Sequence, residues 1–151
     1  KKGIRQVVYL GTSGAIADYQ VGDVTIPDEV IDKKNSVPFR RNLAHAYAAG
    51  LSNRVTVHEG TKHGWVQTVY QETLGLLSDW KSRSVAAMDV EGIYLARFTR
   101  SRDDLKMSAF FVISDQTLGD STIGEDESHL NIIDESVYKL VAFLLPRILS
   151  P

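Results

Sequence analysis

The stretch Val7-Val8-Tyr9-Leu10-Gly11-Thr12-Ser13-Gly14-Ala15-Ile16 joins an apolar run directly to a glycine-rich segment. This pattern predicts a short buried strand over Arg5–Leu10 that ends in a loop. Gly11–Gly14 offers backbone N–H groups that no bulky side chain shields, together with two hydroxyls, and such a loop can hold an oxyanion. A tight connection without any ligand is the alternative, and spacing alone favours it.

Strand-like and helix-like patterns alternate along the rest of the chain. Strands are predicted over Asp23–Ile26, Arg54–Glu59, Ser84–Met88 and Met107–Ile113, and helices over Phe39–Leu51, Val66–Trp80, Asp89–Phe98 and His129–Leu149. We expect a polar turn at Asp32–Ser36, a mobile flap at Gln116–Asp126, and a kink or early end of the last helix at Pro146. The alternation predicts one α/β layered domain over residues 1–151.

The composition indicates an ordinary globular domain. Of the 151 residues 43% are hydrophobic and 24% charged, and the net charge is −2, so a basic surface for nucleic acid or an anionic membrane is not expected. The lack of cysteine fits a reducing compartment, and no apolar stretch approaches the roughly 20 residues that span a bilayer. We expect a soluble, cytoplasmic protein. His58 and His63 have no further ligand cluster beside them, so no metal site is predicted.

Three motifs occur in an order that resembles the nucleoside phosphorylase/nucleosidase family. They are the glycine-rich segment with the following Val21–Asp28, the triplet Asp89-Val90-Glu91, and Ser114-Asp115. The resemblance runs from about Val7 to Leu149 and implies a three-layer αβα fold with a central mixed sheet. It also implies cleavage of the N-glycosidic bond of a nucleoside, of purine type, by phosphorolysis or hydrolysis. No cofactor is implied, although phosphate is a possible co-substrate.

The resemblance assigns the sugar to the acidic triplet. Glu91 would accept hydrogen bonds from the ribose hydroxyls, flanked by Asp89 and by Val90, which stands where the family usually has Met. Gly11, Thr12, Ser13 and Gly14 would face the phosphate or the nucleophile. Without the resemblance, an acidic helix start is the simpler interpretation of the triplet, since the helix dipole favours Asp and Glu there.

The base is assigned to three other places in the chain. Asp115, next to Ser114, would protonate the departing base, because a carboxyl shielded from water can hold its proton near neutral pH. On sequence alone, a turn-capping role for Asp115 is an equal alternative. Trp65 and Tyr70 would stack on the base, although aromatic residues are as often part of the core.

Two departures from the family pattern limit the prediction. Tyr9 stands where phosphorolytic members usually carry an Arg, and a phenol cannot replace a guanidinium fork, so phosphate binding should be weak. The family's N-terminal portion has no counterpart here, so we expect a homo-oligomer or an association with a missing N-terminal segment. The alternatives to an active enzyme are a catalytically impaired nucleoside-binding or regulatory module and a scaffold without a ligand.

Overall fold

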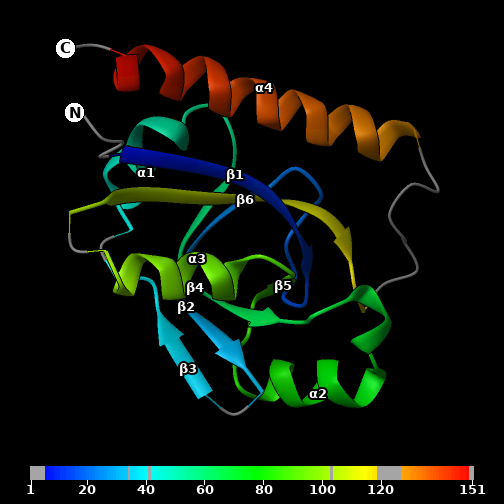
Figure 1. The fold of residues 1–151 in the computed structure, drawn as a ribbon. Coiled ribbons are helices and arrows are strands. Elements are labelled where there is room, and N and C mark those ends of the chain that lie inside the picture. The colour runs from blue at the N-terminus through cyan, green and yellow to red at the C-terminus, as the bar shows by residue number, and fades with distance from the viewer. Residues whose placement is uncertain (1–5, 34, 41, 103, 119–126, 150–151) are drawn as a thin grey trace.

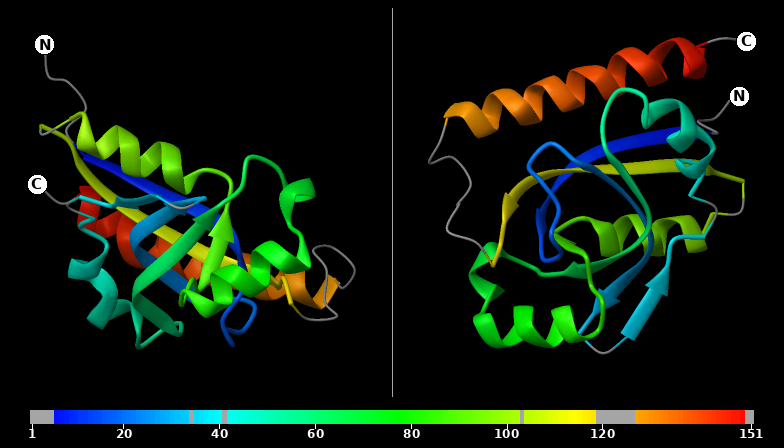
Figure 2. Two further views of the ribbon diagram at one scale, coloured as in Figure 1. Left: turned by 90° about the horizontal axis from the view of Figure 1, so that it is seen from below. Right: turned by 180° about the vertical axis from the view of Figure 1, so that it is seen from behind.

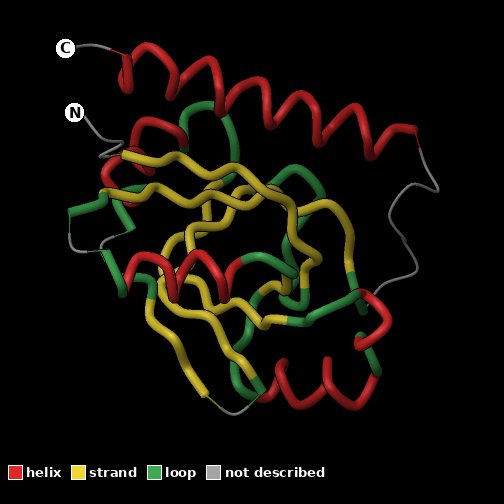
Figure 3. The backbone as a smooth tube through the Cα atoms, in the orientation of Figure 1, coloured by secondary structure: helices red, strands yellow, loops and turns green. Residues whose placement is uncertain are grey.

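The computed structural model describes residues 6–33, 35–40, 42–102, 104–118 and 127–149. Its strands are β1 (Gln6–Ala15), β2 (Val24–Asp32), β3 (Asn35–Pro38), β4 (Val57–Trp65), β5 (Ala87–Asp89) and β6 (Lys106–Gln116). Its helices are α1 (His45–Leu51), α2 (Leu74–Ser82), α3 (Gly92–Arg100) and α4 (Glu127–Leu149), with a 3-10 turn η1 (Val69–Gln71) before α2. The strands form the centre of the molecule and the helices lie around them (Figures 1 and 3).

The sheet is mixed and closes on itself. Its strand order is β3-β2-β4-β5-β1-β6, and β6 also pairs with β2. The pairs β1–β6, β2–β4 and β4–β5 are parallel, whereas β1–β5, β2–β3 and β2–β6 are antiparallel. The turned views show strands that curve round rather than lie in one plane (Figure 2). This closure brings side chains from β1, β2, β4 and β6 to a common interior.

Strand β6 is buried on both faces, which explains its continuous apolar sequence. Phe110 and Val112 pack with α1 and α4, whereas Met107, Ala109 and Phe111 pack with α3. Helix α4 runs along β1 and β6 in Figure 1, and α2 lies at the opposite end of the molecule, where Trp80 packs in a third apolar cluster. Helices therefore cover the mixed sheet, and the predicted α/β fold with a central mixed sheet is confirmed.

Several predicted boundaries were wrong. β1 continues to Ala15, because Gly11–Ser13 pair with β6 residue for residue, so the predicted loop is a strand. The predicted turn at Asp32–Ser36 overlaps a hairpin whose second strand is β3. Helix α4 runs through Pro146 to Leu149 without the early end that we expected.

Two further points concern the predicted flap and membrane-spanning helices. Most of the predicted flap, residues 119–126, lies outside the described residues. Among the residues that are described, no helix is long and apolar enough to cross a membrane.

Candidate functional site

Strand β1 turns alternate side chains toward the interior, and this decides which glycine-rich residues reach the site. Tyr9, Gly11 and Ser13 lie on one face, because side chains alternate along a strand. A Cβ on Gly11 would lie 2.6 Å from Cε1 and 2.7 Å from the hydroxyl oxygen of Tyr9, so the Tyr9 ring lies directly over Gly11. Thr12 is exposed on the other face. Of the two hydroxyls in the predicted loop, the one that faces the interior is therefore that of Ser13, and Thr12 faces outward.

The Tyr9 phenol donates a hydrogen bond to the carboxylate of Glu91. Burial, followed by the charges of Glu91 and Asp89, raises the pKa of Tyr9 to about 12, so its hydroxyl stays protonated at neutral pH. Partial loss of water, followed by the charge of Asp89, raises the pKa of Glu91, while the bond from Tyr9 opposes that shift. Tyr9, at the position where the resemblance implies an Arg, thus contacts Glu91.

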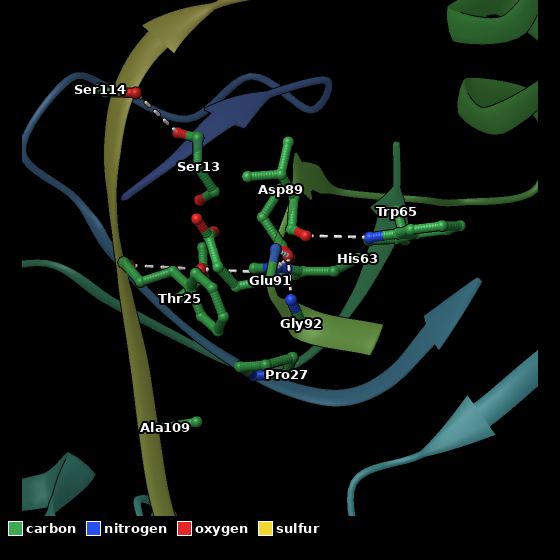
Figure 4. Close-up of polar contacts among 12 residues, drawn as sticks. Ser13, Thr25, Pro27, His63, Trp65, Asp89, Glu91, Gly92, Ala109 and Ser114 are labelled. Carbon is green, nitrogen blue, oxygen red and sulfur yellow. Dashed lines mark hydrogen bonds and ion pairs between the residues drawn. The ribbon is translucent and has the colours of Figure 1, made fainter. Parts of the chain in front are cut away.

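Ser13 has a buried hydroxyl that lacks a partner. Its residue is 3% exposed, and its Oγ makes no hydrogen bond in the described part of the chain. The side chains of Ser13 and Glu91 point toward each other in Figure 4. Because buried polar groups are nearly always hydrogen-bonded, this hydroxyl indicates a place for a ligand or water.

Asp115 lies opposite Gly14 on the neighbouring strand β6, one residue beyond Ser13. The Ser114 hydroxyl is 2.6 Å from Asp115 Oδ1 and 3.3 Å from the Ser13 carbonyl oxygen. Asp115 is 8% exposed, and burial raises the pKa of its carboxyl against the opposing effect of the Ser114 bond. A Cβ on Gly14 would lie 3.2 Å from Asp115 Oδ2, so the glycine makes room for this carboxylate.

Sequence reasoning missed a second carboxyl group near Asp115. Burial and then the charge of Asp115 raise the pKa of Glu72, which lies between η1 and α2. No pattern in the sequence marks Glu72, because its approach to β6 depends on the path of the intervening loop. The negative charge of Asp115 favours the protonated form of Glu72.

The triplet residues Asp89 and Val90 have structural contacts of their own. Asp89 Oδ2 lies 2.8 Å from His63 Nδ1, and Asp89 Oδ1 accepts hydrogen bonds from the N–H groups of Glu91 and Gly92. The carbonyl of Val90 accepts a 2.9 Å bond from Trp65 Nε1, and its side chain packs against the cluster under α2. Asp89 and Val90 therefore anchor the turn before α3, and the Glu91 side chain points toward Ser13 (Figure 4).

The two predicted aromatic residues differ in their surroundings. Trp65 is half-buried and meets Tyr94 edge to face, with ring centroids 5.8 Å apart. Tyr70 is 93% exposed, which is not the environment of a pocket wall. Among the described residues, no group of three or more His, Cys, Asp or Glu side chains could hold a metal ion.

Comparisons with known proteins agree with this architecture. The family model of the Phosphorylase superfamily matches residues 1–145. A solved structure of the P. knowlesi homologue of P. falciparum PNP superposes with a TM-score of 0.65 at 17% identity, covering 91% of this chain and 61% of that one. At this identity the likeness concerns the fold alone, and the chain spans about three fifths of that protein's length. No curated protein matched the sequence. On the family match, the chain belongs to the Phosphorylase superfamily.

Proposed function

We propose that this chain carries the sugar and base groups of an enzyme that cleaves the N-glycosidic bond of a purine nucleoside. The observation that carries the proposal is that the Glu91 side chain points toward the unpartnered Ser13 hydroxyl, while Asp115 lies opposite the next residue of β1, Gly14. Glu91 points toward the Ser13 side chain (Figure 4), and Ser114 links the Ser13 carbonyl to Asp115. Membership of the Phosphorylase superfamily supports this class of reaction, and the purine is proposed because Ser114-Asp115 resembles the motif of the family's purine-specific members.

Glu91 would hold the sugar. A carboxylate accepts hydrogen bonds from vicinal hydroxyls, and here one acceptor position is already occupied by the Tyr9 phenol. The Glu91 side chain points toward Ser13 (Figure 4), whose hydroxyl has no partner among the described residues. A ribose hydroxyl placed between these two residues would satisfy both.

Asp115 would act as general acid. Its raised pKa favours the protonated form that the reaction needs. As the bond between C1′ and the base nitrogen breaks, its electron pair moves to the base and the Asp115 proton neutralises the leaving group. A nucleophile then forms the new bond to C1′; if it is water, it gives up a proton that restores Asp115.

Water is the nucleophile that the charges favour. Tyr9 is neutral at working pH, while Glu91 and Asp89 supply negative charge beside it. A phosphate dianion at this place would meet repulsion instead of a guanidinium clamp. We therefore propose hydrolysis over phosphorolysis.

The test is incubation of the protein with adenosine, inosine and methylthioadenosine, with and without phosphate, followed by chromatographic detection of free base. Base release without phosphate supports a nucleosidase, and release that requires phosphate overturns the proposed nucleophile. Tight nucleoside binding without any release supports the second candidate, a binding or regulatory module, which the loss of the Arg at Tyr9 favours. If the protein neither binds these nucleosides nor releases their bases, the proposed function is refuted.

A further inference from the structure

We propose that His63 is a positioning residue that holds Glu91 in place through Asp89. Three side chains form a buried chain of hydrogen bonds from β2 to the start of α3. Thr25 Oγ1 lies 3.0 Å from His63 Nε2, and His63 Nδ1 lies 2.8 Å from Asp89 Oδ2. We call Thr25, His63 and Asp89 the buried relay. The proposal rests on the sugar-binding role of Glu91 proposed above.

The buried relay ends on the backbone that carries Glu91. Asp89 Oδ1 accepts a 3.0 Å bond from the Glu91 N–H and a second bond from the Gly92 N–H. A Cβ on Gly92 would lie 2.7 Å from both oxygens of Asp89, so glycine alone lets the carboxylate approach the first turn of α3 this closely. The Asp89 carboxylate therefore fixes the backbone from which the Glu91 side chain extends, and His63 in turn holds that carboxylate through its other oxygen.

His63 has no direct access to a substrate. Its residue is 0% exposed, and its ring lies 4.9 Å from the ring of Phe111 between centroids. With both ring nitrogens engaged inside the protein, it acts on the site only through Asp89. The buried Asp89 carboxylate is held by three hydrogen-bond partners, namely His63 and the N–H groups of Glu91 and Gly92. Loss of His63 as a partner would leave one carboxylate oxygen unsatisfied and would let the carboxylate rotate.

Two variants of His63 separate the two ends of the relay. Asn places its amide near the Nδ1 position, so His63→Asn keeps a donor for Asp89 and loses the contact with Thr25. Gln reaches the Nε2 position instead, so His63→Gln keeps the contact with Thr25 and releases Asp89. The matched control is His58→Gln on the same strand, because His58 pairs with Asp23 at 2.8 Å and has no bond to the relay.

The first measurement is calorimetric binding of adenosine and of 2′,3′-dideoxyadenosine, which lacks the hydroxyls that Glu91 would hold. We expect His63→Gln to weaken adenosine binding on the order of tenfold and to leave the dideoxynucleoside nearly unchanged. His63→Asn and His58→Gln should stay close to the wild type for both ligands. An equal loss for both nucleosides in His63→Gln indicates a general structural defect and overturns the proposal.

The second measurement does not depend on any nucleoside. Amide hydrogen exchange at Glu91 and Gly92 should be faster in His63→Gln than in the wild type and close to wild type in His63→Asn. Equal exchange in the two variants overturns the relay, whatever the nucleosides do. Faster exchange in His63→Gln together with a wild type that binds neither nucleoside supports the relay and refutes the proposed function.

Discussion

Asp115→Asn is expected to make the protein more stable and its catalysis much slower. Asp115 is 8% exposed, and among the contacts described for its side chain the donor is the Ser114 hydroxyl at 2.6 Å. Asn keeps the shape of the side chain and can still accept that bond through its carbonyl oxygen. The substitution therefore removes little besides the charge and the transferable proton.

The two effects have separable magnitudes. A general acid typically contributes about 10²- to 10⁴-fold to the rate, and base release should fall by that amount. Burial raises the pKa of Asp115 in the folded state, so the ionised carboxylate opposes folding at neutral pH. One hydroxyl donor does not offset the burial of a charge, and removal of that charge should stabilise the fold by roughly 1–2 kcal/mol.

The sign of the pH dependence follows from the raised pKa. As the pH rises from about 4, where the unfolded carboxyl ionises, wild-type Asp115 loses stability that Asp115→Asn retains, and the difference levels off above the folded pKa. Urea unfolding at several pH values measures this difference, with Asp134→Asn on the exposed face of α4 as a control. A variant that is less stable at neutral pH and still releases base at the wild-type rate would refute both the catalytic role and the electrostatic reasoning.

Three further substitutions test other contacts of the site. Tyr9→Phe removes the bond that lowers the pKa of Glu91, so the pKa of Glu91 should rise. Because adenosine binding needs ionised Glu91, calorimetry on acidification should show the variant losing binding at a higher pH than the wild type. Ser13→Ala removes an unpartnered hydroxyl, so the free energy of unfolding should stay within about 0.5 kcal/mol while adenosine affinity drops about tenfold; unchanged affinity would contradict a ligand contact. Gly92→Ala places a Cβ 2.7 Å from the carboxylate that caps α3 and should cost about 1–3 kcal/mol in urea unfolding, whereas Gly75→Ala, with nothing within 4 Å, should be neutral or stabilising.

The elements of the fold could be predicted from the sequence, whereas the closure of the sheet could not. Hydrophobic periodicity located β1, β6 and the four helices, because each buries a continuous face. β3 was missed because Asn35–Pro38 is a short edge strand with polar residues, which resembles a turn. The β2–β6 pairing, at Thr25 opposite Phe111, joins segments 86 residues apart, and no local pattern predicts it.

The assignment of the site residues stays a prediction, although the structure shows how some of them are arranged. Motif order indicated Glu91 and Asp115; the Glu91 side chain points toward Ser13 in Figure 4, and Ser114 links Asp115 to the Ser13 carbonyl. Ser13 faces inward and Thr12 outward because β1 continues as a strand through Ala15, which the glycines in the sequence did not indicate. His63 was considered only as a metal ligand, since its partners Thr25 and Asp89 come from other strands.

The pKa values of four groups in the site are all raised, and this bears on the chemistry of the site. Burial raises the pKa values of Tyr9, Glu72, Glu91 and Asp115, and for the first three a neighbouring carboxylate raises them further. The electrostatic potential around these groups is therefore negative, so it disfavours added negative charge and favours positive charge. Loss of a base from a nucleoside leaves positive charge on the sugar in the transition state, and fixed negative groups stabilise such charge as it develops. Under the proposed function, the same negative potential would oppose phosphate and favour departure of a protonated base, and Tyr9, where the resemblance implies an Arg, would fit the proposed hydrolysis.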